Sequence, residues 1–597
     1  MILLGSFLLL GIIVVILIST SYVQTRIVKQ LAQRFEETTK QEITFEDLKL
    51  RWDGTLQFQN FYLEDHHQDT LFFIKELKTS LLYFQRLKDS IDLDDLSATG
   101  VVFNLKKYKG EDTHSLKLLL EKFRKDSVQN GNSLFKLASL NLNQLSFFYQ
   151  DENKPNSKPI RLDPVNINAK NFTFEDNGLE VLIENLEGTM YSPLGRQVKA
   201  KGLVHYEPGT LKLEEWHLDS EQSFLIGSLE LMGKNKTLKD FYNQGIISLK
   251  TTSSNFDFAS LFQNSPLQEF PAANSSFNAH GPLKKLNISE LVLTNPFLDF
   301  KGSVTLKNIL EKKNIEWEIN TDSLKVNTID LASLNVIPPQ IKKQLQTINE
   351  IDFKGTVLGT QEQLMLNIHS DNTWGNLMIS GTLGNGIFSS NVKNKNLSLI
   401  GDIRGFDLSK WVAKEMGLTT TANVELSGDF IDKESPNLFW KLKNGSLKNP
   451  KLMLDGIAIE GRVEERRLRN TFSINSKAVK LKSDILYDFS KAVPQLTLAA
   501  NVNHWDLNFI GLQIGSGKRI FKGIVLSDLK GNNLDQLEGE IKISSAAIEN
   551  ENQTVTLNPI SISQNIDKNK TLIEIKNTDC IYGIAEGRFN TSELRGL

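Results

Sequence analysis

The chain has 597 residues, of which 40% are hydrophobic, 38 are glycine and 15 are proline. This composition excludes a collagen-like or low-complexity chain. The 68 Lys and Arg residues nearly balance the 71 Asp and Glu residues, so the net charge of −3 provides no basic excess for binding a nucleic acid. The single cysteine, Cys580, excludes an internal disulfide framework and a thiolate zinc cage.

Residues 1–22 are predicted to form a transmembrane anchor. Residues 2–18 are apolar apart from two glycines and a serine, and about 17–20 such residues span a hydrocarbon layer of about 30 Å. A cleaved signal peptide is the alternative, although no small-x-small cleavage site follows the run. The basic residues Arg26, Lys29 and Arg34 come after the run, and alone they would place the body in the cytoplasm. A large following domain is translocated largely regardless of such charge.

Residues 23–39 are predicted to continue as an amphipathic helix. Ile27, Leu31 and Phe35 recur every four residues, which places them on one helical face. This face either packs on the first sheet or lies on the membrane surface.

From residue 40 onward the hydrophobic period changes from 3.6 to 2. Apolar residues alternate with polar ones in many short segments, as at Val165, Ile167 and Ala169, and such alternation is typical of strands with one apolar face. Turns rich in Asn, Asp, Gly and Ser join these segments. Very few segments have a helical pattern; 114–125 is one and 406–416 is another. The fold class is therefore predicted to be mainly β: an elongated antiparallel sheet with a few short helices.

A glycine flanked by apolar residues at positions −2 and +2 recurs along this sheet. Because the three positions share one face of a strand, the repeat suggests a curved sheet whose concave apolar side forms an open groove. The alternative is that the glycines let two layers pack closely, and each apolar neighbour taken singly fits an ordinary core as well. The groove glycines are Gly227, Gly302, Gly355, Gly381, Gly428 and Gly539. The candidate lining residues are Leu225, Leu229, Phe300, Val304, Phe353, Val357, Ile379, Leu383, Leu426, Phe430, Leu537 and Ile541. A bulky side chain, as in Gly355→Trp or Gly428→Trp, is expected to block this groove in a folded protein.

A second repeat places an aspartate between two apolar residues at the end of a strand. Its four copies contain Asp257, Asp330, Asp407 and Asp506. Aspartate at this position is typical of an N-cap, so each is predicted to cap a short helical turn rather than to take part in catalysis.

The sequence contains no recognisable catalytic or metal-binding motif. The eight histidines are scattered, there is no His-Glu-x-x-His and no nucleophile elbow, and no cofactor is expected. His66 and His67 form the one histidine pair, in a polar run that predicts a hairpin turn. We expect a protein that is not an enzyme and that has no metal site.

The N-terminal part of the chain resembles a known family. After the apolar anchor and the helix at 27–35, the segments EITFEDLKL (42–50), TLQFQNFYLED (55–65), DTLFFIKELK (69–78) and IDLDDLSATGVVF (91–103) follow in order. This series resembles the N-terminus of AsmA-like proteins, and in particular of the TamB-like translocation and assembly proteins of Gram-negative envelopes. The glycine and aspartate repeats resemble the repetitive body of the same family more loosely.

The resemblance implies a single-pass protein of the bacterial inner membrane with its body in the periplasm. It implies an N-terminal β region at 40–130 and, at 131–597, a repetitive body rolled into an open, apolar groove of the β-taco kind. Family members are commonly longer than this chain, and their C-terminal domain is not recognisable here, so the body is expected to be truncated.

The family also suggests a function in outer-membrane biogenesis. We expect the apolar groove to conduct phospholipid between the envelope membranes, with membrane lipids as partners and with an outer-membrane β-barrel assembly protein as a further partner. The first alternative is a scaffold for the translocation and assembly of outer-membrane proteins, which would receive client strands at its sheet edges. The second is a purely structural β-repeat.

Overall fold

The computed structural model describes most of the chain from residue 40 to residue 587. Residues 1–39, which contain the predicted anchor and amphipathic helix, and residues 588–597 lie outside the described part. No helix within the described residues is long and apolar enough to cross a membrane. The internal segments outside the description are 51–54, 81–89, 125–133, 154–158, 176–177, 191–195, 221–222, 237–240, 258–268, 310, 312–313, 336, 338, 388–392, 409–416, 431–435, 450–452, 511–516, 533–536, 568–569 and 578–581.

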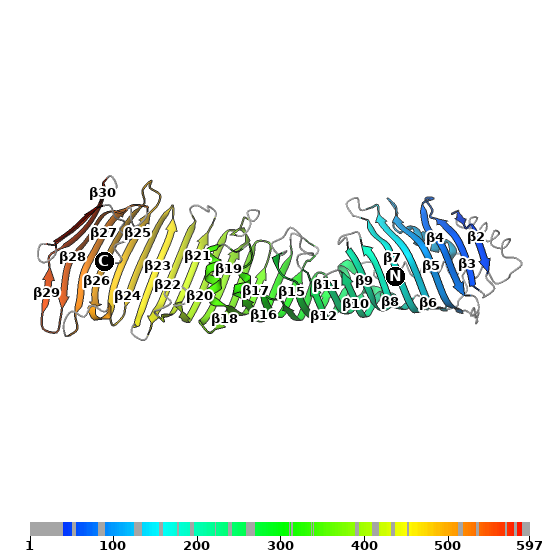
Figure 1. Ribbon diagram of the computed structural model, residues 1–597, viewed down its shortest axis with the longest axis horizontal. Coiled ribbons are helices and arrows are strands. Elements are labelled where there is room, and N and C mark those ends of the chain that lie inside the picture. Colours follow the sequence, from blue (N-terminus) through cyan, green and yellow to red (C-terminus); the bar gives the residue numbers. More distant parts are fainter. Residues whose placement is uncertain are drawn as a thin grey trace. The chain divides into compact units, whose positions relative to one another are not determined.

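The chain divides into two compact units, Met1–Asn295 and Pro296–Leu597. Unit 1 contains fourteen strands and few helices among its described residues (Figure 1). Its elements are β1 (Ile43–Thr44), β2 (Asp47–Leu50), β3 (Thr55–Glu64), β4 (Thr70–Ser80), β5 (Ser90–Lys107), α3 (Ser115–Arg124), β6 (Leu134–Asp151), β7 (Ile160–Glu175), β8 (Gly178–Met190), β9 (Arg196–Glu207), β10 (Thr210–Ser220), β11 (Ser223–Met232), η1 (Lys234–Lys236), α4 (Phe241–Gln244), β12 (Ile246–Phe256), β13 (Ala273–Pro282) and β14 (Lys285–Thr294).

Unit 2 contains eighteen strands among its described residues. Its elements are β15 (Leu298–Lys307), β16 (Glu316–Asn327), α6 (Thr328–Leu331), α7 (Pro339–Ile348), β17 (Glu350–Gly359), β18 (Gln363–Asn372), β19 (Gly375–Gly384), η3 (Asn385–Ile387), β20 (Asn396–Asp407), β21 (Thr419–Asp429), β22 (Asn437–Lys448), β23 (Met453–Glu464), β24 (Arg467–Asn475), β25 (Val479–Asp488), β26 (Gln495–Asp506), η5 (Leu507–Ile510), β27 (Ile520–Lys530), β28 (Glu538–Glu549), β29 (Thr554–Leu557), β30 (Ile560–Asp567), β31 (Lys570–Lys576) and β32 (Tyr582–Gly587).

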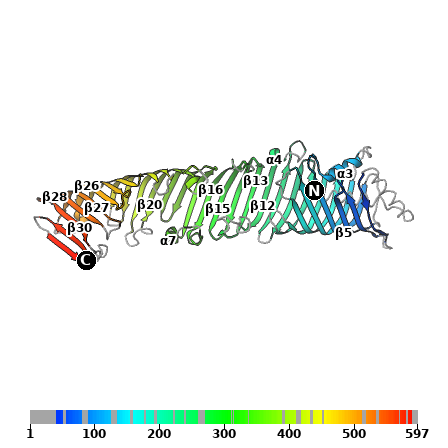
Figure 2. The same cartoon turned by 90° about the horizontal axis from the view of Figure 1, so that it is seen from above.

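Most strands that follow one another within a unit are hydrogen-bonded neighbours, but β1 and β2 both pair with β3, and β29 and β30 both pair with β28. Almost all of the pairs are antiparallel. The exception is β5, which pairs with β6 in parallel from Ser90↔Leu134 to Lys107↔Asp151. A parallel pair needs a crossover connection, and α3 lies in this one, beside β5 (Figure 2). The expectation of a mainly β, antiparallel chain with few helices is confirmed.

The densest core of the described residues lies in unit 1, under β3 to β8. Phe72, Ile74, Val101 and Phe103 are at most 1% exposed. Phe72 pairs with Phe103 and Ile74 with Val101, so these alternating side chains share one face of the sheet. The helix predicted at 114–125 is confirmed as α3, and its Leu116 and Leu119, three residues apart, are buried in the same core.

Bulges interrupt the pairing of many neighbouring strands. The register shifts at Leu213/Trp216 in β10, at Lys250/Ser254 in β12 and at Asn423 opposite β22, among others. Residues with positive φ occur in these strands, including Glu215 and Asn444. A bulge bends its strand and increases the local twist, so these repeated bulges favour a twisted and curved sheet.

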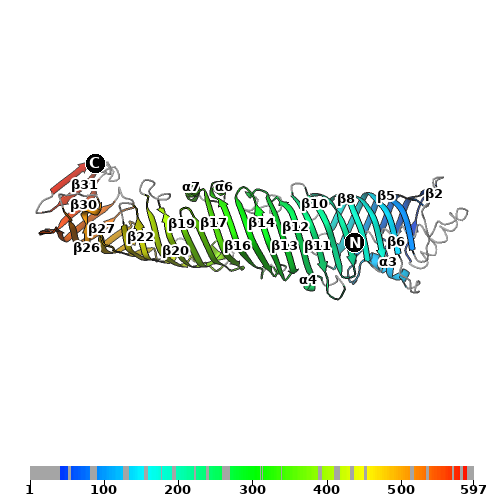
Figure 3. The same cartoon turned by 90° about the horizontal axis from the view of Figure 1, so that it is seen from below.

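The predicted aspartate caps have different outcomes. Asp506 caps η5, because its Oδ1 accepts a hydrogen bond from the backbone N–H of Asn508 at 3.1 Å. The cap of α6 is Asn327 instead of Asp330: its side chain accepts from the N–H of Asp330 and of one other first-turn residue. The prediction for Asp330 was wrong because a polar residue three positions earlier already occupies the cap. Figure 3 shows α6 and α7 at the ends of their neighbouring strands.

The remaining sequence features with helical or capping patterns extend beyond the described part of the chain. Asp257 directly follows β12 and Asp407 is the last residue of β20, but the residues after them are largely undescribed. Of the helix predicted at 406–416, Phe406 and Asp407 belong to β20, and 409–416 lie outside the described residues.

Candidate functional site

A continuous row of mostly apolar side chains crosses the sheet of unit 2, and we call it the central row. Each member is the direct partner of the next across neighbouring strands, and direct partners in an antiparallel sheet point to the same face. The members, in strand order, are Val304, Ile319, Val357, Leu366, Gly381, Leu399, Leu426, Trp440, Gly461, Asn470, Ile485, Leu498, Ser527, Ile541, Ile562 and Ile575.

The central row has an apolar row on either side of it on the same face. In one, Ile379 pairs with Gly401, and Gly401 with Val424. In the other, Leu383 pairs with Leu397. Three adjacent rows therefore give this face an apolar strip several side chains wide.

The residues of the central row are half-buried, except Gly461, which is buried beneath the ring of Trp440. By contrast, Phe58 and Phe72 in the core of unit 1 are 2% and 1% exposed. An apolar face sealed by a second layer would bury its residues as that core does. The strip in unit 2 is therefore an accessible apolar surface.

The opposite face of the same strands is mixed: it carries exposed apolar side chains such as Ile400, together with ion pairs. Glu425 pairs with Lys441, and Lys441 with Glu460; the Nζ of Lys441 lies 2.7 Å from Oε2 of Glu460. The hydrogen bond from Lys441 holds the pKa of Glu460 below its usual value. At β21 to β23 the two faces therefore differ in polarity, because Glu425 and Leu426 are neighbours in the chain and point to opposite faces.

The candidate lining residues are half-buried without exception. Leu225 and Leu229 belong to β11 of unit 1, and the other ten lie in unit 2. Four belong to the central row, Ile379 and Leu383 belong to its two neighbours, and Phe300 and Phe353 both pair with Leu324. The four members of the central row are Val304, Val357, Leu426 and Ile541. Phe430 directly follows β21 and Leu537 directly precedes β28.

The six groove glycines are required by the pairing of the strands. A Cβ built on Gly355 would lie 2.1 Å from the backbone oxygen of Asn367 in the adjacent strand, and its φ is +130°. The other five would place a Cβ 2.0–2.1 Å from a backbone oxygen in the same way. These glycines therefore permit close approach of neighbouring strands. Strand pairing alone explains why glycine occurs at these positions, and a roomy groove is not needed to explain it. Contrary to the expectation from sequence, Gly355→Trp or Gly428→Trp should disturb the pairing itself.

A small pocket opens at the edge of the apolar strip. Its volume is about 190 Å³, and it lies between β25, β26, β27 and the start of β28. Tyr487, Leu496 and Leu529 are successive direct partners in the sheet, and Leu537, one of the candidate residues, completes the apolar wall. The pocket is large enough for a small apolar group.

The glycine motif missed many members of the central row. Ile319, Leu366, Ile485 and Leu498 have no motif glycine two positions away, but they have the alternating pattern of their strands. That alternation was the signal that could have found them. The strand register, which places them beside the predicted residues, could not be obtained from the alternation.

Comparisons with protein-family models, with curated proteins and with solved structures found no match to this chain. The fold and the apolar strip are therefore the observations from which a function is inferred.

Proposed function

We propose that this chain is an envelope protein of the AsmA-like, TamB-like kind whose apolar strip conducts phospholipid between the two membranes. The single observation that carries the proposal is the central row, a half-buried and nearly unbroken apolar line over sixteen strands of unit 2. The ordered N-terminal segments that resemble this family give the proposal its cellular setting: an inner-membrane anchor and a periplasmic body.

The energetics of lipid transfer support an apolar strip of this kind. An acyl chain exposed to water costs about 0.8 kcal/mol per CH₂ group. Strands lie about 4.8 Å apart, so the central row follows a contour of roughly 70 Å. Along this contour an acyl tail exchanges contact with one side chain for contact with the next, and the cost of full exposure is avoided. The central row contains no titratable side chain, so it favours tails through dispersion and burial alone.

Site-specific photo-crosslinking tests the proposal directly. A benzophenone-bearing amino acid is placed at Leu426 on the apolar strip and, as a matched control, at Glu425 on the opposite face. Both variants are expressed as the full chain in a Gram-negative host and irradiated in intact cells. We expect phospholipid adducts at position 426 and at most trace adducts at position 425, as measured by mass spectrometry of the purified chain.

Other outcomes decide against the conduit. Equal lipid labelling at both positions, or none at 426 in a folded chain, would overturn the proposal. Adducts to a folding outer-membrane protein at an edge strand such as β32, with no lipid at 426, would favour the translocation and assembly scaffold. Adducts only within the chain itself would favour a purely structural β-repeat.

A further inference from the structure

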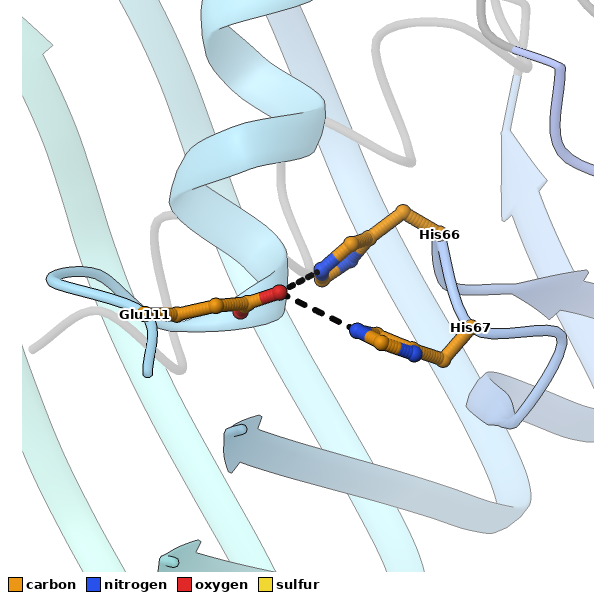
Figure 4. A group of neighbouring side chains, drawn as sticks. All are labelled: His66, His67 and Glu111. Atoms are coloured by element: carbon orange, nitrogen blue, oxygen red, sulfur yellow. Dashed lines mark hydrogen bonds and ion pairs between the residues drawn. The ribbon is translucent and has the colours of Figure 1, made fainter. Parts of the chain in front are cut away.

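Three potential metal-binding side chains converge at one end of the unit 1 sheet, outside the apolar strip. His66 and His67 lie in the turn between β3 and β4, and Glu111 lies between β5 and α3 (Figure 4). The Nε2 atoms of His66 and His67 lie 2.7 Å and 3.0 Å from the same carboxylate oxygen, Oε1 of Glu111. The three atoms lie within 4.8 Å of one another.

The hydrogen bonding of this cluster is incomplete in the described part of the chain. A carboxylate accepts only, so both imidazoles must carry a proton on Nε2 and direct it at one oxygen. Oε2 of Glu111 and Nδ1 of His66 are buried without a hydrogen-bond partner. Buried polar atoms are rarely left unpaired. A cation placed between the two Nε2 atoms and the carboxylate would take the place of the two Nε2 protons that point at the same oxygen. The negative charge of Glu111 would stabilise that cation.

The surrounding residues hold the two imidazole rings in place. The ring of Tyr108 lies 3.9 Å from that of His67 and 5.5 Å from that of His66, measured between centroids. The hydroxyl of Tyr108 lies 2.6 Å from Oδ2 of Asp65 and 2.8 Å from Oδ2 of Asp69. Oδ1 of Asp65 accepts from the backbone N–H of His67 at 2.8 Å. These contacts with Tyr108 and Asp65 orient the two imidazoles before an ion binds.

The local charge also favours a cation. Asp65, Asp69 and Glu111 carry three carboxylates, and Lys106, whose Nζ lies 2.6 Å from Oδ2 of Asp69, supplies one positive charge.

We propose that His66, His67 and Glu111 bind one divalent transition-metal ion of the zinc type. Two imidazoles and one carboxylate, with water in a fourth position, form a known zinc ligand set. With metal–ligand distances of about 2.0–2.1 Å, tetrahedral ligands lie about 3.3 Å apart. The two distances from Nε2 to Oε1 of Glu111, now 2.7 Å and 3.0 Å, need to lengthen by only a few tenths of an ångström. The ion would link the β3–β4 hairpin to the segment that leads into α3, the helix that contributes Leu116 to the core.

Zinc binding to the full chain tests this proposal. The chain is stripped with a chelator and titrated with Zn²⁺, and binding is followed by calorimetry and by the thermal unfolding temperature. We expect one tight equivalent, a higher unfolding temperature, and a loss of affinity of at least about tenfold in His67→Ala and in Glu111→Gln. The matched control is His369→Ala, which removes a histidine that contacts a single carboxylate, Asp371, at 2.7 Å; its zinc affinity should be unchanged.

Two results would overturn the proposal. One is a wild-type chain that binds no zinc equivalent. The other is an equal loss in His369→Ala and His67→Ala, which would mean that surface histidines bind the metal without a built site. If a variant of a ligand residue fails to fold, Co²⁺ titration of the wild-type chain tests whether the metal site exists. Intense visible bands of tetrahedral cobalt support the site, and the weak spectrum of hexahydrated cobalt rejects it.

Discussion

The indole ring of Trp317 lies directly against Gly359, its partner across the pairing of β16 with β17. A Cβ on Gly359 would lie 2.0 Å from Cε2 of Trp317. The same relationship recurs between Trp440 and Gly461, where the corresponding distance is 2.3 Å. In each pair the large ring covers the bare backbone of the glycine, which protects a strand position that otherwise packs poorly.

Gly359→Ala is expected to destabilise the protein by about 1–3 kcal/mol, the usual cost of overpacking a fitted contact. The ring of Trp317 has to move because the added methyl group occupies its position. Urea unfolding of the full chain measures the change. Gly583→Ala is the control, because no atom lies within 4 Å of a Cβ built there. The double variant Gly359→Ala with Trp317→Leu should cost less than the sum of its parts, and strict additivity would contradict a direct contact.

Gly401→Leu is expected to reduce lipid labelling at Leu426 several-fold while the chain stays folded. A Cβ on Gly401 would meet its nearest atom at 3.7 Å, and Gly401 lies between Ile379 and Val424 on the apolar face. The added side chain therefore occupies the strip without straining the backbone. Photo-crosslinking gives the lipid signal, and circular dichroism gives the fold.

The control for that variant is Gly401→Ala, whose small methyl group should leave labelling nearly unchanged. A folded Gly401→Leu chain with full lipid labelling at Leu426 would contradict a transport path along the rows at this position.

Asn470→Leu is expected to stabilise the protein by about 1 kcal/mol. Asn470 is a polar member of the central row, between Gly461 and Ile485, and its Oδ1 is buried without a hydrogen-bond partner among the described residues. Removing an unpaired buried oxygen recovers its desolvation cost. The unfolding midpoint in urea is the measurement.

Asn320→Leu is the contrasting variant. The side chain of Asn320 accepts from Oγ1 of Thr356 at 2.7 Å and donates to Oε1 of Glu318 at 3.0 Å, so the substitution should destabilise. A loss of stability in Asn470→Leu as large as that in Asn320→Leu would mean that the amide of Asn470 is satisfied in solution.

Asp163→Asn is expected to remove a pH-dependent part of the stability. The hydrogen bond from Arg161, and then that from Ser146, hold the pKa of Asp163 below its usual value; their distances are 2.8 Å and 2.7 Å. The unfolded chain, with an aspartate pKa of about 3.9, therefore takes up the proton at a higher pH than the folded chain. The contribution is present above that value and is lost as the pH falls through the lower pKa of the folded state.

The measurement is the difference in unfolding midpoint between the wild type and Asp163→Asn, from about pH 6 to about pH 3. The advantage of the wild type should shrink as the pH falls. A difference that stays constant over this range would show that the charge of Asp163 does not contribute to folding.

The sequence by itself determined the local features of this protein. Strict alternation at positions such as Val165 and Ile167 marked the strands, because the side-chain period of a strand is two wherever it occurs. The helix that contains Leu116 and Leu119 was predicted from the helical spacing of its apolar residues. Both signals depend on the backbone geometry of one short segment, so no knowledge of the rest of the chain was needed.

Only the tertiary structure decided which segments meet. Gly355 lies against the backbone of Asn367, and Glu111 lies beside a histidine pair more than forty residues earlier. These contacts depend on strand register and on the path of connections, which local periodicity does not contain. For the same reason, alternation identified an apolar face on each strand, while the pairing of sixteen strands decided that these faces form one half-buried row.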